Sequence, residues 1–159
     1  MLRTRRFATA FIAALCLIGS AQAVEVPTTD EVRKVLDFYY QGQGLGVVLI
    51  DSKMCSEIGK EGDLKNECVG ELTAIKKDES INMWFAFLIP NGTEKQKILI
   101  QFETGGLTRM VKEIEATGSI RYRTWRKVDF DRAGEWTASI FLDSPAGTKK
   151  IGSRSFTVN

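Results

Sequence analysis

Strand-length segments divided by turn residues fill most of the sequence after residue 44. The segments are LGVVLID, CVGELTAI, SINMWFAFLI, KILIQFE, LTRMVKEIEA, SIRYRTWRKV, EWTASIFLD and KKIGSRSFTV. They are rich in β-branched and aromatic residues and recur at spacings of about 8 to 12 residues. PNGTEK, TGG, DFDRAG and DSPAGT lie between some of them and carry the residues that favour turns. This pattern predicts one mainly β domain over residues 45–159, built as an antiparallel sandwich or barrel.

One segment before these strands has a helical period. In TTDEVRKVLDFYY, apolar residues recur three or four positions apart behind a threonine or aspartate that can cap a helix. They are Val32, Val35, Leu36 and Tyr39. The pattern predicts a short helix from about Thr29 to Tyr40 within an N-terminal segment, residues 24–44. Its apolar stripe is expected to lie against the β domain.

The first 23 residues have the pattern of a secretory signal peptide. Three arginines precede an apolar run from Phe7 to Ile18, which is followed by the small-residue sequence Ala21-Gln22-Ala23. The run is shorter than the roughly 18 apolar residues that a permanent membrane helix needs, and no later segment approaches that length. We therefore expect cleavage after Ala23, a periplasmic or secreted protein, and no integral membrane span.

Net charge argues against a nucleic-acid partner. The sequence has 22 basic and 20 acidic residues, and three of the arginines lie in the predicted signal peptide. The remaining chain therefore carries a net charge near −1. Because nucleic-acid binding depends largely on a positive field, we expect no nucleic-acid partner.

Two cysteines remain after the predicted cleavage, since Cys16 leaves with the signal peptide. Cys55 and Cys68 form an even pair in an oxidising compartment, which favours a structural disulfide. A redox-active pair is the alternative, but the spacing is not Cys-x-x-Cys and no thioredoxin-like unit surrounds it. The sequence between them, including KEGDLKNE, is polar and charged, as expected of an exposed loop that the disulfide holds.

The absence of histidine narrows the chemistry. Serine, cysteine or threonine triads that use histidine cannot be built from this sequence. Zinc and copper sites lose their commonest ligand, so we expect no metal site and no cofactor. Glu113 and Glu115 share a face of a predicted strand, which a solvated edge explains without catalysis. A hydrolase or lyase using carboxylates with a lysine or arginine is the alternative function.

The stretch RYRTWRKVDFDRAGEW, from Arg121 to Trp136, predicts a strand, a turn and a second strand. DFDRAG has the composition of a turn, with Gly134 available for a positive φ angle. In the second strand, alternation predicts an inward face made of Trp136, Ala138, Ile140 and Leu142. In the first strand, the same alternation separates Ile120, Tyr122, Thr124 and Val128 from Arg121, Arg123, Trp125 and Lys127.

The face with Arg121, Arg123, Trp125 and Lys127 is the candidate binding surface. Tryptophan and arginine are enriched where binding energy concentrates, and an indole among guanidinium groups can make cation–π contacts. In the alternative interpretation, the predicted helix lies across this face and covers Trp125, while the arginine head groups reach water.

From about Met83 to Val158 the chain resembles a family of bacterial exported domains of unknown function. The residues that carry the resemblance are an Arg-Thr-Trp strand, a Gly-Glu-Trp strand and a closing Gly-x-x-x-Phe hairpin. This part is also similar to immunoglobulin-like sandwich domains. The resemblance implies export and an antiparallel immunoglobulin-like β-sandwich, which the helix predicted from periodicity precedes, and it carries over no catalytic residue. We expect a non-enzymatic interaction protein of the cell envelope that binds a protein, a glycan or another envelope component.

Overall fold

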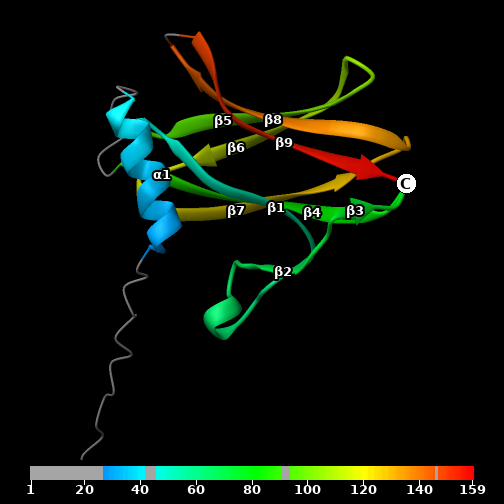
Figure 1. The fold of residues 1–159 in the computed structure, drawn as a ribbon, viewed down its shortest axis with the longest axis horizontal. Coiled ribbons are helices and arrows are strands. Elements are labelled where there is room, and N and C mark those ends of the chain that lie inside the picture. Colours follow the sequence, from blue (N-terminus) through cyan, green and yellow to red (C-terminus); the bar gives the residue numbers. More distant parts are fainter. Residues whose placement is uncertain (1–26, 42–45, 91–93, 146) are drawn as a thin grey trace, which may run out of the picture.

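Two facing β-sheets, one α-helix and a short 3-10 helix at Gly62–Leu64 make up the computed structural model, which describes residues 27–41, 46–90, 94–145 and 147–159 (Figure 1). The predicted signal peptide, its cleavage site and the boundary between residues 44 and 45 lie outside these ranges. Within them, no helix is long and apolar enough to cross a membrane.

The first sheet has the strand order β2-β1-β4-β7, and the second has the order β3-β9-β8-β5-β6. The first sheet contains β1 (Val48–Ile58), β2 (Cys68–Glu71), β4 (Ser80–Ile89) and β7 (Ser119–Asp129). The second contains β3 (Ala74–Ile75), β5 (Gln96–Thr104), β6 (Leu107–Ala116), β8 (Gly134–Ser144) and β9 (Gly147–Val158). The two layers agree with the predicted β-sandwich. The prediction of an entirely antiparallel arrangement was wrong at β3 and β9, which pair in parallel.

Two predicted strands differ from the observed ones. The strand expected to end near Asp51 continues to Ile58, because its second half pairs with β2. The segment CVGELTAI forms two strands, since β2 joins the first sheet and β3 joins the second. The chain crosses between the sheets at this point, and a crossing between layers leaves no mark on local periodicity.

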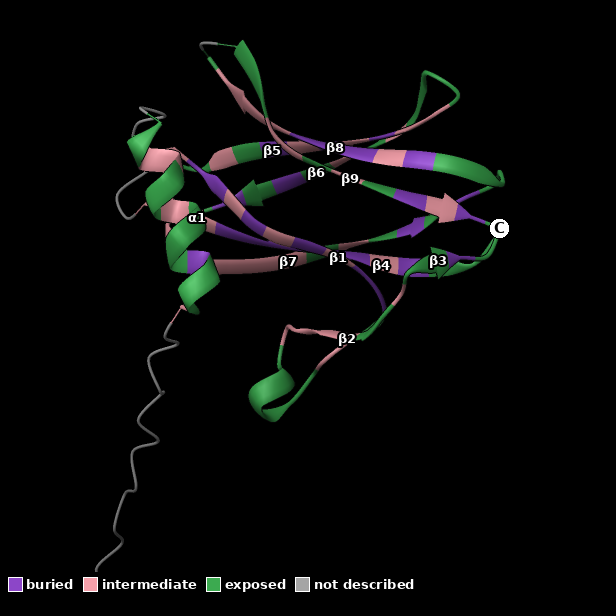
Figure 2. Ribbon diagram, viewed as in Figure 1, coloured by how far each residue is buried: buried purple, intermediate pink, exposed green. Residues whose placement is uncertain are grey.

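The core lies between the sheets, and buried positions alternate with half-buried ones along β5 and part of β8 (Figure 2). Phe130 is at the centre of an aromatic group, with its ring centroid 5.7 Å from Phe102, 4.9 Å from Trp136 and 5.2 Å from Phe156. The ring pairs meet edge to face, which aromatic quadrupoles favour. Trp136, Ala138 and Ile140 are buried and Leu142 is half-buried, which confirms the predicted inward face of β8.

The helix α1 spans Thr29–Tyr40, as predicted, and packs against β1 (Figure 1). A capping box starts it: the Glu31 N–H donates to Thr28 Oγ1 at 3.3 Å, and the Thr28 N–H donates to Glu31 Oε2 at 2.8 Å. The expected burial of its apolar stripe holds only in part, since Val35 and Tyr39 are half-buried but Val32 is 41% and Leu36 48% exposed. Polar contacts also attach the helix: Glu31 pairs with Arg121, and Lys34 donates to the Ile50 carbonyl.

Candidate binding site

The outward face of β7 carries the predicted binding residues, Arg121, Arg123, Trp125 and Lys127. In the register between β7 and β4, Trp125 lies opposite Trp84 and Arg123 lies opposite Ala86. Directly opposed residues of paired strands share a face, so the two tryptophans are neighbours on the outer surface of the first sheet. Trp84 is buried there, whereas Trp125 is 37% exposed.

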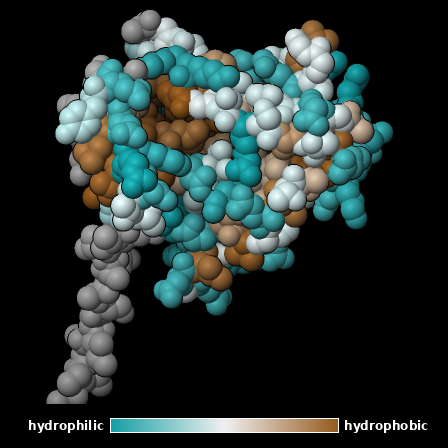
Figure 3. Space-filling model, in the orientation of Figure 1, coloured by the Kyte–Doolittle hydropathy of each residue, from teal (hydrophilic) through white to brown (hydrophobic). Residues whose placement is uncertain are grey.

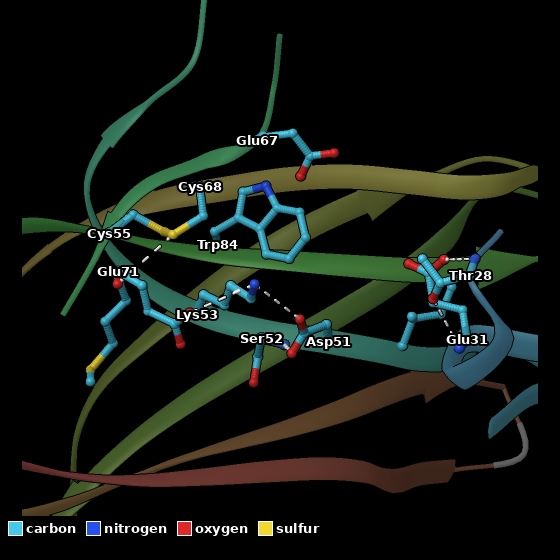
Figure 4. A network of polar contacts seen from close by, with 12 residues as sticks. Thr28, Glu31, Asp51, Ser52, Lys53, Cys55, Glu67, Cys68, Glu71 and Trp84 are labelled. Carbon is cyan, nitrogen blue, oxygen red and sulfur yellow. Dashed lines mark hydrogen bonds and ion pairs between the residues drawn. A yellow bond between two sulfur atoms is a disulfide. The ribbon is translucent and has the colours of Figure 1, made fainter. Parts of the chain in front are cut away.

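Trp84 belongs to a second apolar cluster, separate from the core between the sheets. Its members are Ile50, Cys55, Trp84 and Ala86, with Ile58, Cys68 and Leu88 packed against them. Residues 59–67, the disulfide loop, lie next to this cluster. The Trp84 indole N–H donates to the Asn66 carbonyl at 2.7 Å, and the Cys55–Cys68 disulfide lies beside the ring (Figure 4).

The predicted disulfide is present, with the Cα atoms of Cys55 and Cys68 5.5 Å apart. Within the disulfide loop, the Gly59 N–H donates to the Glu67 carbonyl at 2.9 Å, and the Asn66 N–H donates to the Gly59 carbonyl at 2.8 Å. A Cβ atom at Gly59 would lie 1.8 Å from the Leu64 carbonyl oxygen, so only glycine fits there. Covalent and main-chain bonds together give the disulfide loop one defined shape.

Arg121 and Arg123 hold the disulfide loop and the helix on the sheet. Glu67 Oε1 lies 3.2 Å from Arg121 Nη1 and 2.6 Å from Arg123 Nη1. Glu31 Oε1 lies 3.1 Å from Arg121 Nε, and Arg123 Nη1 also donates to the Lys65 carbonyl at 3.3 Å. These two guanidinium groups are therefore engaged within the protein, and their partly buried ion pairs position the surrounding elements.

Trp125 lies on a shallow cleft of about 490 Å³ between β1, β4, β7 and the disulfide loop. The lining residues are Ser56, Glu57, Ile58, Gly59, Lys60, Asn66, Asn82 and Trp125. The helix contacts the Arg121 end of β7, and Lys127 is exposed at the other side of Trp125. Sequence reasoning predicted Trp125 but missed the other lining residues. The polar composition of the loop indicated exposure, and no local signal indicated that it would fold back toward a tryptophan.

The two carboxylates that the sequence analysis considered for catalysis, Glu113 and Glu115, lie on β6 in the second sheet. Glu113 Oε2 is 3.0 Å from Lys97 Nζ, and Glu115 pairs with Lys95. The hydrogen bond that Lys97 donates to Glu113, together with the negative charge of Glu113, raises the pKa of Lys97 above the usual 10.5. A lysine whose pKa is higher in the folded than in the unfolded state stabilises the fold at pH values below its unfolded pKa. This contribution is lost as the pH rises through the folded pKa. The Lys97–Glu113 pair therefore stabilises the fold below this alkaline range, and both pairs lie away from the cleft.

Comparison with known proteins bears on the fold alone. No family model matches the sequence, and no curated protein matches it. The C-terminal domain of Wzt superposes with a TM-score of 0.50 at 11% identity, covering 72% of this chain and 74% of that domain. The soluble domain of PmoD from Methylocystis has a TM-score of 0.39 at 13% identity, covering 68% of this chain and 89% of its own. A CARDB domain from Pyrococcus furiosus, in complex with di-metal ions, has a TM-score of 0.44 at 7% identity, with coverages of 71% and 87%.

Proposed function

We propose that this chain is an exported, non-enzymatic immunoglobulin-like domain of the cell envelope that binds a partner in the Trp125 cleft. The signal-peptide pattern and the disulfide support an oxidising compartment outside the cytoplasm. The two-sheet architecture supports the immunoglobulin-like assignment. The cleft supports binding, because its volume lies in the range of roughly 300–1,000 Å³ typical of ligand sites.

The proposal rests on the exposed indole of Trp125, which lies beside a disulfide loop that contacts within the protein hold in place. The disulfide, the Trp84 hydrogen bond and the ion pairs of Glu67 hold the disulfide loop before any ligand arrives. A site held in this way loses little conformational entropy on binding. Tryptophan in a well-defined pocket is also a frequent centre of binding energy.

The lining of the cleft favours a neutral polar ligand with a flat apolar face. Glu57 and Lys60 balance each other in charge, and Ser56, Asn66 and Asn82 are uncharged polar residues of the same lining. Sugar rings and uncharged polar peptide segments have this combination of surfaces. We therefore place a glycan or a neutral peptide segment of an envelope component in the cleft.

The cleft also disfavours the alternative of a carboxylate-based hydrolase or lyase. Hydrolysis by two carboxylates requires a pair of them flanking the bond that breaks, separated by roughly 5–9.5 Å in glycosidases. Among the lining residues, Glu57 alone is acidic. Glu113 and Glu115 lie on β6 in the other sheet, paired with lysines.

Replacing Trp125 with alanine is expected to abolish most capture of the partner and to leave the fold intact. Loss of a binding hot spot costs about 2 kcal/mol or more, which is roughly a thirtyfold loss in affinity. Because the side chain is 37% exposed, the free energy of unfolding should fall by less than about 1.5 kcal/mol, below the range for buried aromatics. The measurement is capture from an envelope extract, with the bound material assayed for both protein and carbohydrate.

Val111→Ala is the matched control, since Val111 is 50% exposed on β6, away from the cleft, and should capture as the wild type does. Undiminished capture by Trp125→Ala would remove the cleft from the proposal. A large loss of stability would instead make Trp125 a packing residue.

A further inference from the structure

A second groove lies between β1 and β9, where one edge of each sheet remains open. β1 pairs with β4 along one side, and on its other side it pairs with β2 only from Cys55 onward. β9 pairs with β8 along one side, and with β3 only at Thr157 and Val158. In the described part of the chain, the remaining lengths of these two edges are not paired with another strand. Figure 1 shows β1 and β9 next to each other on the viewed side.

The lining of the groove is mainly polar and charged, with a smaller apolar part from Leu49, Ile50 and Ile151. The groove measures about 330 Å³ and is lined by Lys34, Leu49, Ile50, Asp51, Ser52, Ile151, Gly152, Ser153 and Arg154. The two strands approach most closely at Gly152, where a Cβ atom would lie 2.3 Å from Leu49 Cδ2. Figure 3 shows this face hollowed beside the helix, with hydrophobic side chains inside and hydrophilic ones around the rim.

Main-chain groups of β1 point into this groove and are bonded to side chains. The Ile50 carbonyl accepts a hydrogen bond from Lys34 Nζ, and the Ser52 carbonyl accepts one from Arg154 Nη1. The Ser52 N–H donates to Asp51 Oδ1 at 2.8 Å. One step further along the same edge, the Met54 carbonyl accepts a main-chain N–H, that of Leu72, at 2.8 Å. At Met54, this edge of β1 thus already accepts a hydrogen bond from another main-chain segment.

Carbonyls two residues apart on a strand are separated by about 6.8 Å, which is the repeat of N–H groups along an extended chain. An extended polypeptide therefore presents N–H donors at the same spacing as the carbonyl acceptors on this edge of β1. Lys34 and Arg154, once displaced from the carbonyls, would meet the strand's side chains. Two cations at one groove are complementary to acidic residues, and Leu49 and Ile151 are complementary to apolar ones.

We propose that the open edge of β1 between Leu49 and Lys53 binds an extended peptide segment of a partner, in which acidic and apolar residues alternate. Main-chain N–H groups of the segment replace Lys34 and Arg154 on the Ile50 and Ser52 carbonyls. The two cations then pair with carboxylates of the segment. This site is separate from the Trp125 cleft, and either can exist without the other.

The test uses a fluorescein-labelled peptide, Glu-Val-Glu-Val-Glu-Val with capped ends, titrated with the purified protein and followed by fluorescence anisotropy. Binding is expected, and it should slow hydrogen exchange at residues 49–53. The same peptide N-methylated at alternate amides should not bind, since it lacks the donors for the β1 carbonyls. Lys34→Gln with Arg154→Gln keeps donor groups but removes both charges, and should weaken binding at least about tenfold.

Trp125→Ala and Lys127→Gln are the controls and should bind the peptide as the wild type does. Equal binding of the N-methylated peptide would overturn the proposal, because charge alone would then explain the interaction. No binding of the unmodified peptide would do the same, and would assign Lys34 and Arg154 to guarding the edge against association. Peptide-insensitive dimers in sedimentation, with slowed exchange at residues 49–53, would show that a second copy occupies the edge and would also overturn it.

Discussion

Trp136→Ala is expected to lower the free energy of unfolding by about 3–5 kcal/mol, the cost of removing a large aromatic side chain from a packed core. Trp136 is 2% exposed, its ring lies 4.9 Å from that of Phe130, and its indole N–H donates to the Arg132 carbonyl at 3.0 Å. The substitution leaves both a cavity in the aromatic group and an unpaired carbonyl. Urea unfolding followed by circular dichroism measures the loss.

Trp125→Ala makes the same chemical change at an exposed position and is the matched control for this measurement. The two variants should differ in unfolding free energy by more than about 1.5 kcal/mol, because burial sets the cost of truncating a side chain. A midpoint for Trp136→Ala close to that of the wild type would mean that β8 presents its other face to the core.

Removal of the disulfide, by Cys55→Ala with Cys68→Ala, should lower the free energy of unfolding by about 3 kcal/mol. Closing a loop with a sequence separation of 13 restricts the unfolded chain, and opening it returns that entropy. Alanine suits the position, since Cys55 is fully buried and a serine hydroxyl there would lack water. Denaturant unfolding of the double variant beside the oxidised wild type gives the difference.

The same variant tests the link between the disulfide and the Trp125 cleft. Without the bond, residues 59–67 are attached through the Trp84–Asn66 hydrogen bond and the Glu67 ion pairs, so capture of the partner should weaken as well. Capture at the wild-type level, together with the expected loss of stability, would show that these polar contacts shape the cleft by themselves. Two alkylatable thiols in freshly exported protein would contradict the disulfide itself.

The elements of the fold were predictable because local patterns specify them. The three- and four-residue spacing of apolar side chains located the helix at Thr29–Tyr40, and alternation identified the strands and the inward position of Trp136. Both patterns depend on neighbours in the chain and on whether one face of an element meets water. The pairing of Cys55 with Cys68 followed from counting, since only two cysteines remain after the predicted signal peptide.

The candidate sites depended on which distant segments became neighbours. β-branched and aromatic runs predict that strands exist, but not that β2 and β3 enter different sheets, which leaves β1 and β9 with open edges. The same holds for Glu67, which reaches two arginines more than fifty positions away on β7 and so holds the disulfide loop beside Trp125. A polar loop residue carries the same local signal whether it faces water or an ion pair. Only the folded chain decides between these, because the energy of such contacts depends on distance in space and not on distance in sequence.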